Sequence, residues 1–388
     1  MLARYLGVPR ISSDHPERAA ILDSISLHEP AKNGPIIDVD AAASQAGAVE
    51  VRELQPADSH RWDEFVSACD EATFFHRAGW KTVIERAFGH RTKFLYAEAG
   101  GRIEGILPLA EVKSILFGHA LVSLPFCVYG GVAAGSERAR RLLDEAAVAL
   151  AEEWRVDHLE YRSLAPRHSE WAHTDLYVTF RKAIDREVER NLNAIPRKQR
   201  AMVRKGIKAG LKSEIDEGVE RLFPAYADSV HRLGTPVFSR RYFEILREVF
   251  GSDCEVLTVT RDGELIASVM SFYFRDEVLP YYGGGTEHAR EVAGNDFMYW
   301  ELMRRACERG IRVFDYGRSK RGTGSFDFKK NWGFEPQPLH YEYRLFRGKR
   351  VPEHNPLNPK YRLFIKLWRQ LPLPLANLIG PHIVKSLG

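Results

Sequence analysis

Charged and polar side chains gather around one short apolar segment in the second half of the chain. This segment carries Asp315, Tyr316, Arg318 and Ser319 close together in the sequence. The planar guanidinium of Arg318 is suited to gripping a phosphate or a carboxylate, with Ser319 beside it. Asp315 is a candidate base for the proton of an attacking amine, and Tyr316 is a candidate donor to a leaving group. These residue types predict a site for an anionic small molecule or saccharide. The alternative is a set of half-buried strand residues beside a surface arginine.

A glycine-rich segment upstream is expected to contribute to the same edge. Tyr282, Gly283 and Gly284 end an apolar run and precede a helical pattern that begins near Asn295. A strand that ends in glycines before a helix presents unpaired backbone N–H groups and the positive end of the helix dipole, which together hold anions. Tyr282 is a second candidate proton donor, and Asn295 is expected to cap the helix or contact the ligand. The alternative is a tight connection that binds nothing, which is what we expect of the corresponding first-half segment, 133–136.

A strongly basic segment lies between the two halves of the chain. Residues 196–212 include seven Lys or Arg residues and no acidic residue. Arg200 and Arg204 fall on one stripe of the predicted helix, together with Arg197 and Lys208. We expect an anionic partner here: a diphosphate-linked saccharide, a tRNA acceptor stem or lipid head groups. The alternative is a solvated helix face. The net charge of only +4 argues against a protein dedicated to nucleic-acid binding.

The elements that must position these residues occur twice in the chain. In each half an apolar run, a tight turn and a second apolar run predict a β-hairpin, with Gly100-Gly101 and Asp262-Gly263 as the turns. A further strand is expected to end at Tyr129 in one half and at Tyr282 in the other. A helical pattern and a closing strand follow at similar spacing, over 137–154 and 158–163 in the first half and 296–309 and 313–319 in the second. The repeat predicts an α/β fold built from a duplicated unit of hairpin, strand, helix and strand.

Length and composition place this duplicated unit in a multi-domain protein. The 388 residues predict two or three domains. We expect a flexible leader over 1–47, a first domain over 48–190, a second domain over 191–350 with the basic helix 196–212, and a basic amphipathic tail over 351–388. The four cysteines lie far apart and the histidines lack ligand spacing, so we expect neither disulfides nor a metal. No apolar stretch approaches the roughly 18 residues of a membrane span, which favours a cytoplasmic protein.

The C-terminal tail has its own composition. No acidic residue follows Glu353, and residues 361–371 set Lys and Arg beside bulky apolar residues. Such a segment can lie peripherally on the inner face of the cytoplasmic membrane, with its basic residues toward anionic lipid. The alternative is a tail that packs on the body of the protein.

Three stretches, in this order along the chain, carry a resemblance to a known family. An aromatic strand end that runs into a helix with Trp80 spans 74–89, the basic helix spans 195–211, and the most specific stretch runs from Asn295 to Pro336. With the duplicated unit, they resemble the FemAB-like branch of the GNAT superfamily, whose fold is a tandem GNAT-like acyl-CoA N-acyltransferase unit of mixed sheets flanked by helices. Together with the long ending, they are similar to the FemAB-like proteins found beside PEP-CTERM/exosortase exopolysaccharide systems.

The resemblance implies an acyltransferase that moves an acyl or aminoacyl group to an amino group of a cell-envelope or exopolysaccharide precursor, by direct attack in a ternary complex. In the peptidoglycan relatives a Phe-Lys pair supports the reacting centre, and Phe328-Lys329 looks similar; a lysine ammonium suits the developing oxyanion. The implied donor is acyl-CoA or aminoacyl-tRNA, without a metal. The loop after Arg318 differs in spacing and position from the pyrophosphate loop of CoA-dependent GNAT enzymes. The alternatives are an aminoacyl-tRNA-dependent transferase acting on a peptidoglycan precursor and a non-catalytic binding module of a polysaccharide assembly system.

Overall fold

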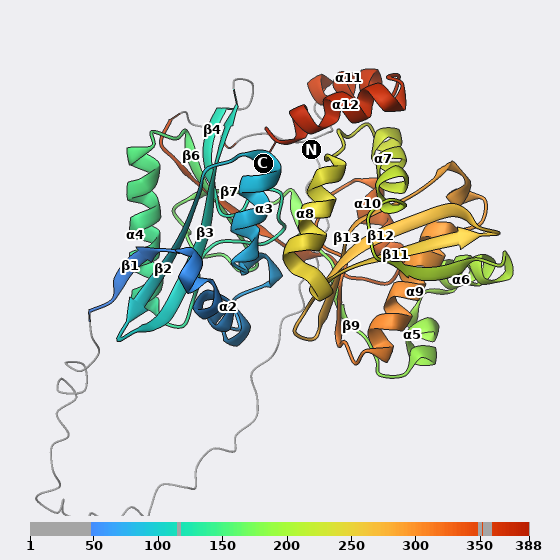
Figure 1. The fold of residues 1–388 in the computed structure, drawn as a ribbon, viewed down its shortest axis with the longest axis horizontal. Helices are drawn as coiled ribbons and strands as arrows, with labels where there is room; N and C mark the ends of the chain where they lie inside the picture. The colour runs from blue at the N-terminus through green and yellow to red at the C-terminus, as the bar shows by residue number, and fades with distance from the viewer. Residues whose placement is uncertain (1–47, 115–117, 348–350, 352–358, 388) are drawn as a thin grey trace, which may run out of the picture. The chain divides into compact units, whose positions relative to one another are not determined.

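The computed structural model describes residues 48–114, 118–347, 351 and 359–387. Over these residues the strands form two large mixed sheets and one small sheet, with helices packed against the large sheets (Figure 1). The expected leader, residues 1–47, lies outside the described residues, as do residues 352–358 at the start of the expected tail. No helix among the described residues is long and apolar enough to cross a membrane.

The first large sheet has the strand order β1-β2-β3-β4-β6-β17-β7, with β5 paired to β3. Its strands are β1 (Glu50–Glu53), β2 (Thr92–Ala99), β3 (Arg102–Ser114), β4 (Gly118–Val122), β5 (Ala133–Ala134), β6 (His158–Ser163), β7 (Ala172–Thr174) and β17 (His340–Leu345). The two faces of β2 are covered by different helices, because successive side chains of a strand point to opposite sides. Phe94 and Tyr96 pack in the core that includes α2 (Ser59–Ala68) and α3 (Gly79–Phe88), whereas Leu95 packs in the core of α4 (Glu137–Glu153).

The second large sheet has the order β10-β11-β12-β13-β14-β9. Its strands are β10 (Lys212–Asp216), β11 (Cys254–Arg261), β12 (Glu264–Phe274), β13 (Glu277–Gly285), β14 (Val313–Asp315) and β9 (Arg181–Ala183). The helices of this half are α5 (Val188–Ala194), α6 (Arg197–Lys208), α7 (Leu222–Leu233), α8 (Arg240–Phe250), α9 (Gly294–Glu308) and α10 (Gly324–Asn331). The small sheet has the order β15 (Ser319–Lys320), β8 (Tyr177–Thr179), β16 (Gln337–Pro338). Helices α11 (Pro359–Trp368) and α12 (Leu373–Val384) follow. Short 3-10 helices are η1 (Pro56–Asp58), η2 (Phe74–His76), η3 (Gly251–Asp253) and η4 (Glu287–Arg290).

The predicted repeat is confirmed in its main elements. The hairpins are β2–β3 and β11–β12, and their turn residues Gly100, Gly101, Asp262 and Gly263 all have positive φ, as tight hairpin turns require. In each half a strand, a helix and a closing strand follow, namely β4, α4 and β6 in one half and β13, α9 and β14 in the other. The chain thus has the predicted tandem α/β architecture.

The predicted strand ending at Tyr129 is wrong, because β4 ends at Val122 and the chain then loops back on itself. The loop passes so close to its own start that a Cβ on Gly130 would lie 1.8 Å from the carbonyl oxygen of Ser123. Such a contact admits only glycine. Glycine at this position therefore serves the close approach of two backbone segments, which a strand pattern cannot reveal.

The predicted helix over 296–309 ends close to Glu308, the last residue of α9, whereas the predicted basic helix 196–212 extends past Lys208, the last residue of α6, to the first residue of β10. Gly310 and Gly210 follow α9 and α6 with φ of 79° and 75°, as expected of glycines just beyond a helix. Asn295 does not cap α9, since the helix begins at Gly294 with Ala293 in the left-handed conformation as its N-cap. The basic segment forms α6, and its predicted helix is confirmed.

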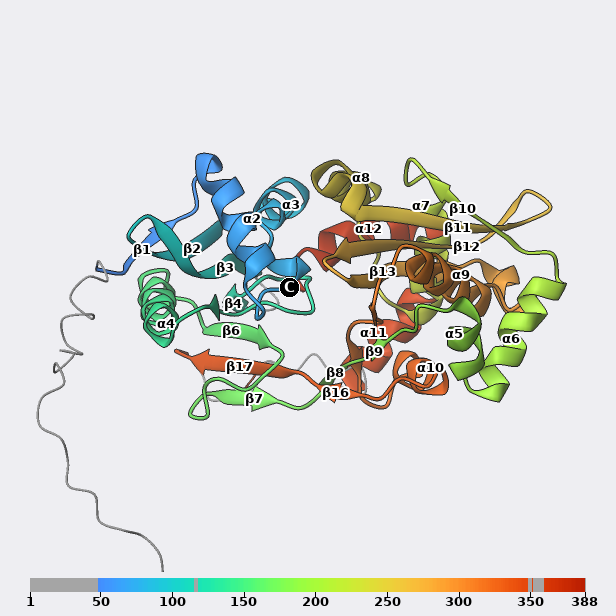
Figure 2. The same ribbon diagram turned by 90° about the horizontal axis from the view of Figure 1, so that it is seen from below.

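Two strands cross between the two halves of the sequence (Figure 2). β9 lies before the predicted boundary at residue 190, yet it pairs antiparallel with β14 of the second sheet. β17 follows all strands of the second sheet, yet it pairs with β6 and β7 of the first. Each large sheet is therefore completed by a strand from the other half. The pairings of β9 and β17 therefore both cross the predicted boundary at residue 190.

Candidate functional site

The candidate site lies where β13 and β14 separate. These two strands run parallel and are paired only at Glu277–Val313 and Val278–Phe314. Beyond this point β13 continues along β12, whereas the chain after β14 turns away to β15 and pairs with β8. Where two adjacent parallel strands separate in this way, the groups on their facing edges no longer have a neighbouring strand to pair with. The predicted residues 315–319 lie at this point.

Asp315 is fully buried, and its carboxylate is surrounded by donors. Oδ2 accepts from the hydroxyl of Tyr129 at 2.7 Å, and Oδ1 accepts from the backbone N–H of Gly317 at 2.7 Å and from Thr179 Oγ1 at 3.3 Å. Arg181 Nε lies 3.4 Å from Oδ2. Burial raises the pKa of Asp315 above its usual range, although Arg181 opposes this. The carboxylate thus ties together β8, β9, β14 and a tyrosine of the first half, with no exposed oxygen for a substrate.

Lys329 points from α10 to the same turn. Its Nζ donates to the carbonyl oxygens of Gly317 and Arg318, both at 3.0 Å. Burial lowers the pKa of Lys329 to about 7, with Asp315 opposing and Arg318 assisting the shift. A lysine in this state exchanges its proton near neutral pH while it holds the Gly317–Arg318 turn.

Arg318 is a half-buried cation that stacks on tyrosines. Its guanidinium carbon lies 4.8 Å from the centroid of the Tyr177 ring and 5.7 Å from that of Tyr341, and its Nη1 donates to the Tyr341 hydroxyl at 2.9 Å. Among the described residues no carboxylate pairs with Arg318. Burial, together with Arg318, lowers the pKa of the neighbouring Lys320 to about 8. The surroundings of Arg318 are therefore positively charged, which suits an anionic ligand.

Three further predicted residues lie around this turn. Tyr316 is buried among Tyr299, Phe314 and other rings, and its hydroxyl has no hydrogen-bond partner among the described residues. Phe328 packs against Tyr299 of α9 and against Tyr316, with 5.7 Å and 6.5 Å between ring centroids. Ser319 is buried in β15, and its Oγ likewise lacks a partner among the described residues. Each is a buried hydroxyl without a partner among the described residues, a group that a bound ligand can satisfy.

The glycine-rich segment lies in β13, and helix α7 packs against it. Tyr282 is buried, and its hydroxyl lies 2.7 Å from that of Tyr242. Gly283 and Gly284 are within β13, paired with Val269 and Ser268 of β12. A Cβ on Gly284 would lie 2.6 Å from the carbonyl oxygen of Ala225 in α7. The close approach of α7 accounts for glycine at this position, and it closes that side of β13 to a ligand.

The N-terminus of α9 carries a carboxylate instead of an anion-binding group. Asp296 Oδ1 accepts from Gln199 Nε2 of α6 at 2.5 Å and from Trp332 Nε1 at 3.0 Å. Burial raises the pKa of Asp296 above its usual range. Asn295 is half-buried beside it, and its Oδ1 has no partner among the described residues. The negative charge of Asp296 makes this helix end a poor place for a diphosphate.

The two predicted arginines of α6 lie away from the turn and differ from each other. Arg200 Nη1 donates to the carbonyl oxygen of Asn193 at 2.7 Å, which closes the α5–α6 connection. Arg204 is exposed and, in the part of the chain that the structure describes, forms no ion pair. The same holds for four more exposed cations of this helix: Arg197, Lys198, Lys205 and Lys208. Helix α6 thus presents a positive surface.

Sequence reasoning missed the residues that the first half and the crossing strands bring to the site. Tyr129 contacts Asp315, while Tyr177 and Tyr341 surround Arg318. Tyr341 lies in β17, and its hydroxyl also donates to the carbonyl oxygen of Val128 at 2.8 Å. The single available signal was the repeat itself, which placed Tyr129 and Tyr282 at corresponding positions. The strand crossing that brings Tyr341 here has no local pattern.

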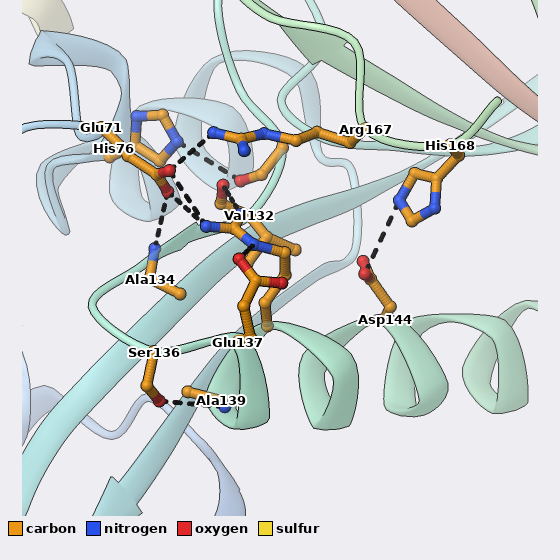
Figure 3. Close-up of polar contacts among 12 residues, drawn as sticks. Glu71, His76, Val132, Ala134, Ser136, Glu137, Ala139, Asp144, Arg167 and His168 are labelled. Atoms are coloured by element: carbon orange, nitrogen blue, oxygen red, sulfur yellow. Dashed lines mark hydrogen bonds and ion pairs between the residues drawn. The ribbon is translucent and has the colours of Figure 1, made fainter. Parts of the chain in front are cut away.

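The corresponding edge of the first half, where we expected segment 133–136 to bind nothing, holds a cluster of polar side chains whose charges are paired with one another (Figure 3). Glu71 accepts from Arg140 Nη2 at 2.8 Å and from Arg167 Nη2 at 2.6 Å, and it also accepts from the backbone N–H of Ala134. His76 beside it contacts the carbonyl oxygen of Gly131, and burial lowers its pKa to about 4. Every charge here has a partner, so this cluster joins segments of the first half. Among the described residues, no group of three or more His, Cys, Asp or Glu side chains is placed to hold a metal ion.

Comparisons with known proteins agree with this architecture. Residues 197–330 match the acetyltransferase (GNAT) domain family. No curated protein matches the chain by sequence. Among solved structures, FemX superposes with a TM-score of 0.61 at 14% identity, covering 76% of this chain and 97% of FemX.

Two further solved structures have the same tandem fold at lower similarity. The C-terminal domain of a putative lysylphosphatidylglycerol synthetase from Agrobacterium fabrum has a TM-score of 0.51 at 12% identity, covering 74% of this chain and 91% of its own. A tandem GNAT protein from the clavulanic acid biosynthesis pathway has a TM-score of 0.50 at 13% identity, covering 78% of this chain and 100% of its own. Residues 197–330, which hold Asp315, Arg318 and Lys329, thus match the acetyltransferase (GNAT) domain family, and the chain has the tandem fold of FemX and of the tandem GNAT protein.

Proposed function

We propose that this protein is an acyltransferase that moves an acyl or aminoacyl group to an amino group by direct attack, with donor and acceptor bound together. The observation that supports this most is Arg318, a cation without a carboxylate partner among the described residues, at the separation of β13 and β14 in the GNAT domain. A donor of either class carries phosphate groups, which a guanidinium binds through parallel hydrogen bonds. The stacked tyrosines Tyr177 and Tyr341 hold this guanidinium in one orientation.

The other groups of the turn take roles that follow from their contacts. Lys329 orders the Gly317–Arg318 backbone and, when neutral, still has two N–H donors for the two carbonyl oxygens and a lone pair for the proton of the attacking amine. Asp315 positions Gly317 and Tyr129, and its burial makes it a positioning residue instead of the base. The orphaned hydroxyls of Tyr316 and Ser319 are candidate donors to the donor substrate's leaving group or carbonyl.

The acceptor in this proposal is an amine on a cell-envelope or exopolysaccharide precursor. This part rests on the resemblance to the FemAB-like proteins of PEP-CTERM/exosortase systems. The structural neighbours FemX and the lysylphosphatidylglycerol synthetase domain have the same fold, at identities that support the fold alone. We place the reaction at the cytoplasmic face of the membrane, with an anionic saccharide as the substrate class.

An aminoacyl-tRNA donor is the second candidate, and the surface of α6 favours it over acyl-CoA. Five exposed cations of α6 lack ion pairs among the described residues, and Arg204 is at their centre. Asp296 at the N-terminus of α9 disfavours the pyrophosphate of CoA there. We expect filter retention of aminoacyl-tRNA to weaken as salt rises and to fall about tenfold in Arg204→Ala combined with Lys208→Ala. A matched control is Arg261→Ala, an exposed arginine at the end of β11. Retention that is equal in all three proteins would reject the tRNA donor.

The acyltransferase proposal is tested through Arg318. Purified protein is titrated with acetyl-CoA and with aminoacyl-tRNA, and single-turnover transfer of a labelled acyl group to amino-sugar nucleotides is followed by mass spectrometry. We expect Arg318→Gln to bind the donor at least about tenfold more weakly, since it loses a charge-assisted contact. Arg321→Gln, on the exposed part of the same loop, is the control and should bind as the wild type does. Donor binding without any transfer would favour a non-catalytic binding module, and equal binding by Arg318→Gln would overturn the assignment of the site.

A further inference from the structure

Exposed large apolar side chains are concentrated at one place on the described chain. Nine such side chains are exposed, and six of them lie in α11 and α12: Leu363, Phe364, Leu367, Leu375, Leu378 and Ile379. A seventh, Leu233, ends α7, on which these helices pack. The remaining two, Leu164 and Ile207, lie elsewhere. Single exposed apolar residues are ordinary, whereas a contiguous group marks a surface that contacts something apolar.

Each of the two C-terminal helices has a buried face and an apolar exposed face. In α11, Trp368 is buried at 4% exposure, while Leu363 and Leu367, one turn apart, are exposed at 60% and 56%. In α12, Ala376, Gly380 and Val384 form the buried stripe. On the opposite side, Leu375, Leu378 and Ile379 are exposed, and Leu378 reaches 69%. The spacing of these residues places them together on the outward face of their helix.

These helices are fixed to the body of the protein, so their outward faces have a defined direction (Figure 1). A Cβ on Gly234 would meet Ile365 Cγ2 at 2.5 Å, and one on Gly380 would meet the backbone nitrogen of Val237 at 2.9 Å, which shows how closely α11 and α12 approach the end of α7. Arg369 Nη2 donates to the carbonyl oxygen of Leu233 at 3.2 Å. His90 of the first half contacts the carbonyl oxygen of Lys385 at 2.8 Å.

Every charged residue that α11, α12 and the residues beside them contribute is positive. Lys366, Arg369 and Lys385 are exposed on or beside the two helices. No acidic residue occurs anywhere after Glu353. Apolar side chains flanked by Lys and Arg match a bilayer with anionic lipids, whose head groups attract the cations while its acyl chains accept the leucines. A second copy of the chain would bring the same positive charges face to face.

We propose that Leu233, Leu363, Leu367, Leu375, Leu378 and their apolar neighbours on α11 and α12 form a membrane-docking face, which inserts shallowly into an anionic bilayer. The helices lie along the interface, because none of the described helices can cross it. Docking through this face holds the protein at a surface where lipid-linked substrates are concentrated. This inference stands on the exposed side chains and charges of the C-terminal helices and does not depend on the acyltransferase proposal.

The test uses the full chain and sedimentation with sucrose-loaded vesicles. One set is phosphatidylcholine alone, and the other contains about a third phosphatidylglycerol, which supplies the negative surface potential. We expect wild-type protein to sediment with the anionic set and to remain largely unbound with the neutral set. Leu375→Ser combined with Leu378→Ser should reduce binding to anionic vesicles by about tenfold or more, because two inserted side chains are lost. Lys366→Gln combined with Lys385→Gln should weaken binding and flatten its dependence on salt.

The control removes an exposed apolar side chain from elsewhere. Leu164→Ser should sediment as the wild type does, since Leu164 lies outside the membrane-docking face. All substituted positions are exposed, so circular dichroism is expected to show an unchanged fold. Equal sedimentation of the Leu375/Leu378 variant and the wild type would overturn the proposal. So would a wild-type dimer, seen by light scattering, that the same leucine substitutions convert to a monomer without any vesicle binding by the wild type.

Discussion

At the scale of single residues, burial gives Asp315 and Lys329 properties that differ from those their residue types suggest. Asp315 is a candidate base by type, but its carboxylate is fully buried and accepts from Tyr129, Thr179 and the backbone of Gly317. Lys329 is a cation by type, but burial brings its pKa to about 7. Burial therefore moves the pKa of both groups away from their usual ranges, upward for Asp315 and downward for Lys329.

Replacing Lys329 by methionine is expected to change how stability depends on pH. The pKa of a lysine in the unfolded chain is about 10.4, whereas burial lowers the pKa of Lys329 to about 7. Between these values the unfolded chain binds a proton that the native protein does not, so this residue makes the free energy of unfolding rise with pH across that window. Below about pH 7 both states are protonated and the residue destabilises the fold fully.

Urea unfolding at about pH 6 and about pH 9.5 measures this effect. Relative to the wild type, Lys329→Met should lose about 1–3 kcal/mol of the rise between the two pH values, a range that allows for partial solvent exposure. Its neighbour Lys330 is exposed, and Lys330→Met is the control that should keep the wild-type rise. An unchanged rise in Lys329→Met would mean that Lys329 is not titrated in this range.

At the scale of elements, the packing of α7 on β13 explains a motif that resembles an anion-binding turn. Gly284 lies where a Cβ would meet the carbonyl oxygen of Ala225 and the Cβ of Ser229, both at 2.6 Å. The strand can pass under the helix only because this position has no side chain. A run of glycines before a helix can form an anion-binding turn, or it can allow another helix to pack closely on the strand. Here the close approach of α7 accounts for Gly284.

Gly284→Ala should therefore destabilise the protein by about 1–3 kcal/mol, because α7 must move away from β13. Thermal unfolding measures the loss. Gly135→Ala is the matched control, since a Cβ there would lie 3.7 Å from its nearest neighbour, the carbonyl oxygen of Glu104. We expect little change in that variant. A Gly284→Ala protein as stable as the control would show that α7 adjusts without cost.

At the scale of the described chain as a whole, the crossing strands link the two halves. β9 completes the second sheet and β17 completes the first, while Tyr129 and Asp315 join the halves through a buried hydrogen bond. Aromatic contacts such as Phe74 on Phe272, with 4.5 Å between ring centroids, continue one core between them. The two halves are therefore expected to fold as one cooperative unit.

Scanning calorimetry tests this expectation. The wild type should show one transition, with calorimetric and van't Hoff enthalpies in agreement. Tyr341→Ala in β17 should lower the stability of the whole transition by about 3–5 kcal/mol, because a large buried side chain is removed. His340→Ala, a half-buried neighbour on the same strand, is the control with a small effect. Two separate transitions, with only one of them moved by Tyr341→Ala, would show that the halves unfold independently.

The sequence by itself determined the local elements and their duplication. Strand alternation, helical periodicity and turn chemistry are properties of neighbouring residues, so β2–β3, β11–β12, α4, α6 and β6 could be predicted from them. Asp315 and Arg318 were also found from their residue types and their place at the end of a predicted strand, whereas Lys329 was implied by the resemblance to the FemAB-like family. Their types pointed to an anionic ligand and an amine.

Only the tertiary structure decided what those residues contact. Tyr341 reaches Arg318 because β17 returns to the first sheet, and Tyr129 reaches Asp315 from the other half. Such pairings join residues far apart in the chain and leave no periodic signal in either partner. For the same reason, the direction of the leucines on α11 and α12 became clear only when their buried faces were seen against α7. The local sequence gives the residue types that could take part in chemistry, whereas packing decides their accessibility and their protonation.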